Sequence, residues 1–163
     1  MDSLKITHNI PIETINLEKN REPSKMSEED LIWCFGAEIQ FKSAPSENIL
    51  MELEVTLFGF LSDFLGVIDE LSYLNEGDSR IINDPYGSYS LEVSKDGNFF
   101  KFVDNFSGQS FQSNANEFRS AYAELVKNCI VDVEEKFPAL LENPNYIKMK
   151  KRFFGKKGCI QER

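Results

Sequence analysis

The feature that most restricts the fold of this chain is a change in the spacing of its apolar residues. Between residues 31 and 43 apolar and polar side chains alternate, so that Phe35, Ala37 and Ile39 share one side of the pattern. A period of two predicts a strand that is buried on one face. From residue 50 onward apolar residues recur at every third or fourth position, which predicts a helix over residues 48–74 with an acidic outer face. The chain therefore combines strands with helices.

The start of this helix has two interpretations. Residues 45–47 form a helix-start signal, with a proline, a serine that can cap the helix and a glutamate in the first turn. However, Leu53, Val55 and Leu57 also alternate with acidic residues, so the first turns are compatible with a strand as well. The helix is expected to end at residues 75–78, whose asparagine and glycine tolerate the left-handed backbone of a C-terminal cap.

The rest of the chain supplies further strands and a second long helix. Weak alternation predicts a first strand near residues 10–17, and stronger patterns predict strands at residues 80–82, 86–94, 99–104 and 109–113. The Asp-Gly pair at residues 96–97 is a strong β-hairpin signal. Asn114, with Glu117 three residues later, resembles a capping box and opens a helix over residues 114–137 that Pro138 ends. We therefore expect an α+β fold, in which an antiparallel sheet of four to six strands has two main helices packed on one face.

Acidic and basic residues are segregated along the chain. Of the 27 Asp and Glu residues, 26 lie in residues 1–147, together with 11 of the 18 Lys and Arg residues. That part has a formal charge of −15, and residues 148–163 have a formal charge of +6. We expect a single acidic α+β domain over residues 1–147 and a basic C-terminal tail over residues 148–163. The tail shows no strong apolar period, so we expect that the fold does not require it.

This charge distribution predicts the kind of partner. A strongly negative body attracts cationic molecules and repels nucleic acid, so we expect a basic protein partner. The tail interleaves basic and aromatic residues, a composition that suits nucleic acid. The acidic body would oppose the approach of a polyanion, however, and we expect no nucleic-acid partner.

The sequence shows none of the common motifs of catalysis or metal binding. His8 is the single histidine and lies in the polar N-terminal region, so a nucleophile would lack its usual base. Cys34, Cys129 and Cys159 are widely spaced, and the acids of residues 69–84 do not follow the calcium-loop spacing. We expect no enzyme activity, no cofactor and no metal site. A small enzyme that uses carboxylates alone is the catalytic alternative, and it would need a deep pocket with two acids and apolar neighbours.

The sequence also bears on location. The longest apolar stretch, residues 57–68, is interrupted by Ser62 and Asp63 and is shorter than the ~20 residues that span a bilayer. The N-terminal residues lack the basic and apolar regions of a secretory signal. An odd number of cysteines without close pairing fits a reducing compartment. We expect a cytoplasmic protein with no membrane anchor.

The densest negative charge lies in residues 52–104, which contain 11 acidic and 3 basic residues. Within this range, residues 84–90 place two tyrosines on a loop rich in glycine and serine. Tyrosine supplies a large contact area at low entropic cost, so this loop resembles a protein-recognition surface. The alternative is that the tyrosines pack on the edge of the sheet. The candidate partner-binding residues are Asp69, Glu70, Glu76, Asp78, Asp84, Tyr86 and Tyr89.

The size of the chain, its charge and the run of residues 33–91 together resemble a known class of protein. Two segments are the landmarks of this run: WCFGAEI at residues 33–39 and DPYGSYSL at residues 84–91. The chain resembles the immunity (antitoxin) proteins that bacteria encode beside polymorphic or contact-dependent toxins. The resemblance implies a non-catalytic protein that neutralises a cognate cationic toxin domain, commonly a nuclease, by forming a stoichiometric complex. The sequence leaves open the alternative of a subunit or adaptor in a larger cytosolic assembly.

Overall fold

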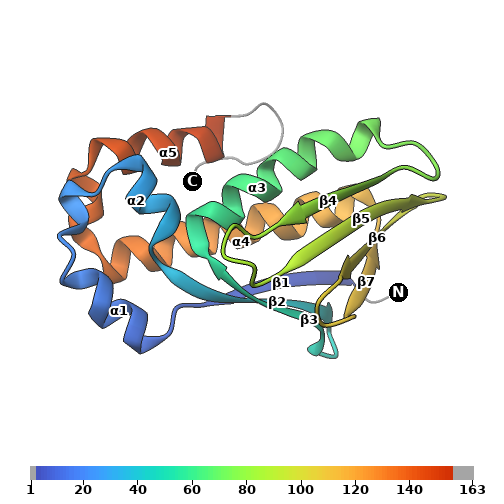
Figure 1. The fold of residues 1–163 in the computed structure, drawn as a ribbon, viewed down its shortest axis with the longest axis horizontal. Helices are drawn as coiled ribbons and strands as arrows, with labels where there is room; N and C mark the ends of the chain where they lie inside the picture. Colours follow the sequence, from blue (N-terminus) through green and yellow to red (C-terminus); the bar gives the residue numbers. More distant parts are fainter. Residues whose placement is uncertain (1–2, 156–163) are drawn as a thin grey trace.

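The computed structural model describes residues 3–155 and arranges them in two antiparallel sheets and five α-helices (Figure 1). The strands are β1 (Ser3–Asn9), β2 (Gly36–Ala44), β3 (Asn48–Thr56), β4 (Ser79–Asn83), β5 (Ser90–Asp96), β6 (Phe99–Asp104) and β7 (Ser110–Ser113). The α-helices are α1 (Ile12–Lys19), α2 (Glu28–Trp33), α3 (Leu57–Glu70), α4 (Ala115–Lys136) and α5 (Pro144–Gly155). The expected α+β class is confirmed.

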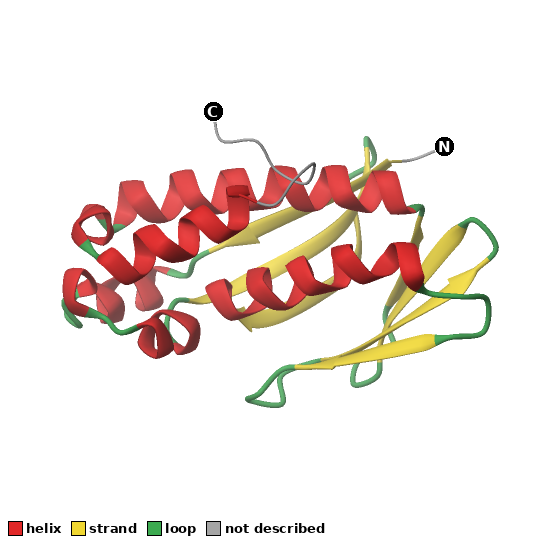
Figure 2. Cartoon of the chain, turned by 90° about the horizontal axis from the view of Figure 1, so that it is seen from above, coloured by secondary structure: helices red, strands yellow, loops and turns green. Residues whose placement is uncertain are grey.

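The first sheet has the strand order β1-β2-β3. Ala37, Ile39 and Phe41 of β2 are buried and alternate with half-buried polar residues, as the period of two predicts. The buried face of this sheet lies against α4 and α3 (Figure 2). Its other face carries polar side chains, among them those of Glu38, which is half-buried, and Glu54, which is exposed.

The second sheet has the order β4-β5-β6-β7. A column of phenylalanine rings joins it to the first sheet: Phe111 of β7 stacks on Phe41 of β2 and on Phe102 of β6, with centroid distances of 4.8 and 4.6 Å. Phe102 also stacks on Phe118 of α4 at 4.6 Å. Because all four rings are buried, both sheets share one core with α4.

The arrangement of the strands differs from the expected single sheet of four to six strands, because β3 and β5 belong to different sheets. The helix expected over residues 48–74 begins only at Leu57. Residues 48–56 form β3, and residues 45–47 form the turn between β2 and β3 instead of a helix start. The alternation of acids with apolar residues decided the outcome, because pairing with β2 buries Leu53 and Val55 on one face.

Two other local predictions are confirmed, and one is wrong. The β5–β6 hairpin turns at the predicted Asp-Gly pair, where Gly97 has a φ of 61°. The side chain of Asn114 accepts a hydrogen bond from the Glu117 nitrogen at 2.8 Å and caps α4, as predicted. The carboxylate of Glu117 instead accepts from the Leu4 nitrogen of β1 at 2.7 Å. The strand expected near residues 10–17 is wrong, because residues 12–19 form α1.

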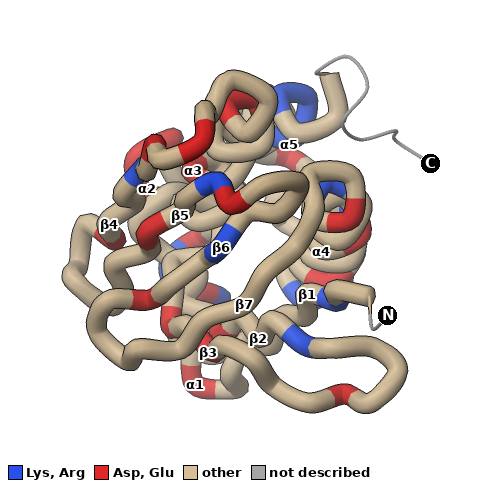
Figure 3. The backbone as a smooth tube through the Cα atoms, turned by 90° about the vertical axis from the view of Figure 1, so that its right-hand side faces the viewer, with Lys and Arg blue, Asp and Glu red and all other residues tan. Residues whose placement is uncertain are grey.

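The expectation of a dispensable tail over residues 148–163 is wrong for residues 148–155. These residues complete α5, whose Met149 and Phe153 are each 1% exposed and belong to the core. The basic residues of α5, blue in Figure 3, partly pair with the acidic body. Lys150 lies 2.8 Å from Glu134, and Arg152 lies 2.5 Å from Glu28. The remainder of the tail, residues 156–163 with Cys159, lies outside the described residues.

No helix among residues 3–155 combines the length and the apolar character needed to cross a bilayer. The most apolar one, α3, has 14 residues, which is shorter than the ~20 residues that a membrane span requires.

Candidate functional site

The seven predicted partner-binding residues lie at the two ends of β4. Asp69 and Glu70 end α3, and Glu76 and Asp78 lie in the connection from α3 to β4. The remaining three, Asp84, Tyr86 and Tyr89, lie in the β4–β5 loop.

Three of the acids before β4 form ion pairs or hydrogen bonds with other residues of the chain. Glu70 forms an ion pair with Arg80 of β4. The carboxylate of Glu76 accepts a hydrogen bond from the Gly97 nitrogen in the β5–β6 turn at 3.0 Å, and that of Asp78 accepts from the Asn75 nitrogen at 3.1 Å. Since these carboxylates already have partners within the chain, we assign them a structural role in this region.

The β4–β5 loop divides into buried and exposed residues. Tyr89 is 1% exposed and packs edge-on against Phe60 at 6.2 Å, so the prediction that it contacts a partner is wrong. The reason is the period of β5, because Tyr89 shares the buried face of Leu91 and Val93. Burial, together with the negative charges of Asp63 and Asp84, raises the pKa of Tyr89, so its hydroxyl stays protonated. Tyr86, in contrast, is 59% exposed.

Tyr86 contacts an aromatic residue from a distant part of the chain. Its ring meets that of Trp33, the last residue of α2, edge to face, with the centroids 4.5 Å apart and the planes at 82°. Trp33 is itself 37% exposed. Sequence reasoning did not include Trp33 among the site residues, although the segment of residues 33–39 had marked the resemblance. Exposed aromatic pairs of this kind are typical of interaction surfaces.

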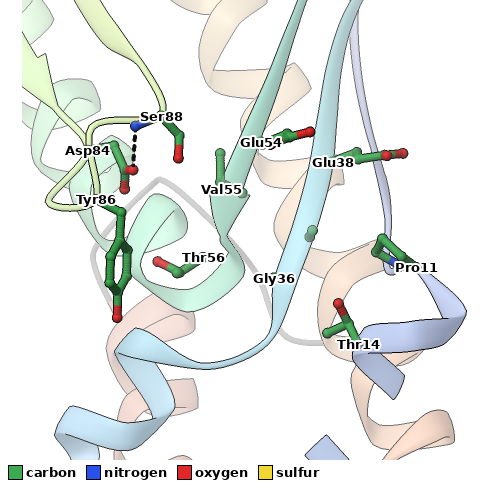
Figure 4. A pocket seen from close by; sticks show the side chains of 11 residues that line it. Pro11, Thr14, Gly36, Glu38, Glu54, Val55, Thr56, Asp84, Tyr86 and Ser88 are labelled. Carbon is green, nitrogen blue, oxygen red and sulfur yellow. Dashed lines mark hydrogen bonds between the residues drawn. The ribbon is translucent and has the colours of Figure 1, made fainter. Parts of the chain in front are cut away.

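Beside this pair lies a hollow with a volume of about 310 Å³ (Figure 4). It is formed where the start of α1, the strands β2 and β3 and the β4–β5 loop meet, and its lining residues include Thr14, Gly36, Glu38, Glu54, Asp84 and Tyr86. Ala37 and Val55 line it as well, and both are buried. We call this feature the acidic hollow, because three of its lining residues are carboxylates.

Glu38 and Glu54 reach the acidic hollow from neighbouring strands. They are direct partners in the β2–β3 register, so their side chains share the open face of the sheet. Glu38 accepts a weak hydrogen bond from the Asn9 amide at 3.2 Å. Within residues 3–155, no Lys or Arg pairs with Glu38, Glu54 or Asp84. Among residues 3–155, no ion pair therefore compensates the negative charge of the hollow.

Two features of the acidic hollow bear on what its carboxylates can do chemically. Acid–base catalysis by paired carboxyls needs an apolar site around one of them, and Glu54 is exposed. In the described part of the chain, no three His, Cys, Asp or Glu side chains converge closely enough to hold a metal ion.

Two residues with reactive side chains lie elsewhere. His8, which the sequence places in the polar N-terminal region, has an 11% exposed side chain, and its Nε2 lies 2.8 Å from Asp132, which also pairs with Lys136. Cys34 is buried, and its sulfur accepts a hydrogen bond from Arg21 at 3.3 Å. Burial raises the pKa of Cys34 despite this contact, so the thiol is not activated.

Comparison of the chain with protein-family models, curated proteins and solved structures finds no match. The geometry of the acidic hollow and the charge of the molecule are therefore the basis for assigning a function.

Proposed function

We propose that this protein is a non-catalytic binding protein that neutralises a cognate cationic toxin domain, a nuclease, by forming a stoichiometric complex. The observation that carries the proposal is the exposed Trp33–Tyr86 pair beside three carboxylates that form no ion pair with a Lys or Arg among residues 3–155. Aromatic residues dominate the energetic centre of many interfaces, and the charges around them select the partner. The immunity proteins that this chain resembles act in this way.

A nuclease offers the complementary surface. It must present Lys and Arg side chains to hold phosphates, so its substrate-binding face is cationic. A protein with a formal net charge of −9 approaches such a face faster than a neutral protein would. Once bound, the acidic surface occupies the cations that the nuclease needs for nucleic acid. We place the complex in the cytoplasm, where the nuclease would otherwise reach its substrate.

The test is to measure association and dissociation rates with the product of the adjacent gene over a salt series. Raising the salt from 0.01 M to 0.1 M shortens the Debye length from ~30 Å to ~10 Å, so association should slow markedly while dissociation changes less. Glu54→Lys should slow association further. Tyr86→Ala should mainly speed dissociation, because it removes an exposed aromatic anchor.

Tyr73 provides the matched control. It is 82% exposed on the segment after α3 and does not line the acidic hollow, so Tyr73→Ala should leave both rates unchanged. Equal effects of Tyr73→Ala and Tyr86→Ala would contradict the proposed surface. Absence of a complex, together with strong self-association of the purified protein, would favour a subunit of a larger assembly instead.

A further inference from the structure

Strand β1 forms one edge of the first sheet and runs beside α4 (Figure 3). The backbone N–H group of Leu4 donates to the carboxylate of Glu117 in α4, so it does not bond to β2. The residue opposite Leu4 in the register, Ser43, directs its carbonyl to the Glu47 nitrogen at 2.8 Å. Opposed residues of an antiparallel pair exchange either two backbone hydrogen bonds or none. Leu4 and Ser43 therefore exchange none, and the backbone groups of Leu4 point away from β2.

The same alternation places the backbone groups of Ile6 and His8 on the outer edge of the sheet. The register between β1 and β2 is continuous from Ser3 to Asn9, so every second residue of β1 faces away from β2. Within residues 3–155, the outward N–H and C=O groups of Ile6 have no hydrogen-bond partner. Ile6 is only 4% exposed, so water has little access to these groups. Unpaired backbone groups in such a place are unfavourable, and a donor and an acceptor that reached them would lower their free energy.

A cavity with a volume of about 430 Å³ lies directly beside this edge. Residues 3–7 of β1 form one wall, and the other wall is a stripe of α4 that consists of Glu117, Ser120, Ala121, Glu124 and Asn128. These positions recur at every third or fourth residue, so they share one face of the helix. We call this feature the β1 groove. A further strand of the first sheet would lie in it, because neighbouring strands are about 4.7–4.9 Å apart in the plane of a sheet.

Glu117 occupies the position of an acceptor from such a strand. Its Oε1 lies 2.7 Å from the Leu4 nitrogen, where the carbonyl oxygen of a neighbouring strand would otherwise accept. The opposite edge of the sheet is satisfied within the chain, since the Glu52 nitrogen of β3 donates to the Gln109 side chain at 3.1 Å. Edge strands that remain unpaired are templates for an added strand. The unpaired groups of Ile6 therefore specify an extended backbone as the ligand of the β1 groove.

The charges of the β1 groove favour a basic partner over a second copy of this chain. Helix α4 runs parallel to β1, because its start contacts Leu4 and its later part contacts His8. Glu124 lies between these two contacts. Two copies that paired through β1 around a twofold axis at Ile6 would bring both Glu124 side chains toward the axis, where like charges repel. A basic segment of another protein is attracted instead, since within residues 3–155 no Lys or Arg pairs with Glu117 or Glu124.

We propose that an extended basic segment of the partner pairs with β1 in the β1 groove and adds a fourth strand to the first sheet. This inference rests on the proposed function and names a second surface that the partner contacts. The backbone of the segment supplies a donor and an acceptor to Ile6 and to His8, which gives strand addition its affinity. Its side chains on the α4 side alternate with those on the open side, and basic ones on the α4 side meet Glu117 and Glu124.

The experiment titrates the full chain with the acetylated and amidated peptide Arg-Thr-Val-Thr-Arg, and backbone amide shifts locate its binding. The two arginines and the valine share one side of this extended peptide, so the valine lies opposite Ile6 when the arginines face α4. Saturable shifts are expected at Leu4, Ile6 and His8. N-methylation of the valine removes the inward donor and should weaken binding about tenfold. N-methylation of the second threonine alters a donor that points away from β1, and it should change binding less than about twofold.

Two glutamates of α4 provide a matched pair of variants. Glu124→Gln removes a carboxylate of the β1 groove and should weaken peptide binding about threefold, the effect of one exposed ion pair. Glu135→Gln makes the same charge change on the same helix, but Glu135 does not line the groove, so binding should stay unchanged. Both residues are exposed, and neither substitution disturbs the core. In the complex with the product of the adjacent gene, hydrogen exchange of the Ile6 and His8 amides should slow at least about tenfold.

Several results would overturn the inference. These are equal losses from the two N-methylated peptides, amide shifts outside the β1 groove, or equal losses in Glu124→Gln and Glu135→Gln. A dimer of the purified protein with a protected Ile6 amide would show that a second copy occupies the groove. If the adjacent gene product binds without slowing exchange at Ile6, the added strand fails while the proposed function stands. If the peptide pairs with β1 but no basic domain binds, the groove stands and the proposed function fails.

Discussion

The carboxylate of Asp104 shows how a single buried acid organises a turn in this protein. Asp104 is 3% exposed at the end of β6, and it accepts backbone hydrogen bonds from Ser90 and Ser107, both at 3.1 Å. These bonds connect the start of β5 to the β6–β7 turn. Burial by itself would raise the pKa of Asp104, but the hydrogen bonds from Ser107, Ser90 and Phe106 outweigh it and lower the pKa.

This pKa shift predicts how stability depends on pH. An unfolded aspartate has a pKa of about 3.9, so the stabilisation by Asp104 is fully present above that pH and is lost as the pH falls through the lower, folded value. Asp104→Asn should reduce the free energy of unfolding by about 1–2 kcal/mol at pH 7. Urea unfolding between pH 7 and pH 3 should show this difference shrinking below about pH 4. A difference that stays constant with pH would contradict the prediction, and Asp96→Asn at the exposed hairpin is the control.

At the scale of an element, α3 contains two glycines in different surroundings. A Cβ atom on Gly59 would lie 2.7 Å from the Thr56 hydroxyl and 3.3 Å from the backbone oxygen of Ile32 in α2. A Cβ atom on Gly66, about two helical turns further along α3, would meet no atom within 4 Å. Gly59 therefore permits the close approach of α2 and α3, whereas Gly66 contributes only backbone freedom.

The two glycines should respond to alanine with opposite signs. Gly66→Ala should stabilise the protein by about 0.5–1 kcal/mol, because alanine lowers the entropy of the unfolded chain at a helical position. Gly59→Ala should destabilise it, since the Thr56 side chain can rotate away but the Ile32 carbonyl cannot without moving α2. Chemical denaturation of both variants measures the effect. Stabilisation by both substitutions would show that α2 does not pack closely on α3.

At the scale of the whole molecule, contacts between the two sheets make one folding unit. Besides the phenylalanine column, the Gln109 side chain accepts a hydrogen bond from the Glu52 nitrogen of β3 at 3.1 Å. Helix α5 extends the same core at the other end, where Tyr146 meets Phe58 of α3 with ring centroids 5.9 Å apart. Neither sheet has a core of its own that excludes the other.

Unfolding should therefore be cooperative. Thermal and urea transitions followed by Trp33 fluorescence and by far-ultraviolet circular dichroism should coincide. Phe111→Ala, which interrupts the phenylalanine column, should cost about 3–5 kcal/mol and move both transitions together. Two separated transitions, in the unmodified protein or in this variant, would show that the sheets unfold independently.

Features that depend on residues close in the chain could be predicted from the sequence. The alternation in β2, the Asp-Gly hairpin and the cap at Asn114 are of this kind, and all three are confirmed. Such patterns state which face is buried, since burial and hydrogen bonding within an element repeat with its own period. The sequence also contained a helical pattern for α5, because its buried residues Tyr146, Met149 and Phe153 are spaced by three and four residues. The basic residues between them concealed this stripe.

Only the tertiary structure decided where residues 48–56 and the site lie. The apolar residues of that segment fit both periods, and pairing with β2 selected the strand. Trp33 and Tyr86 belong to separate elements, and no local pattern states that their rings meet. The same holds for Glu38 and Glu54, which a hairpin register brings face to face. By itself the sequence determined the class of fold, the burial of most strands and the acidic character of the molecule. The acidic hollow depends on distances between elements, and packing of the shared core sets those distances.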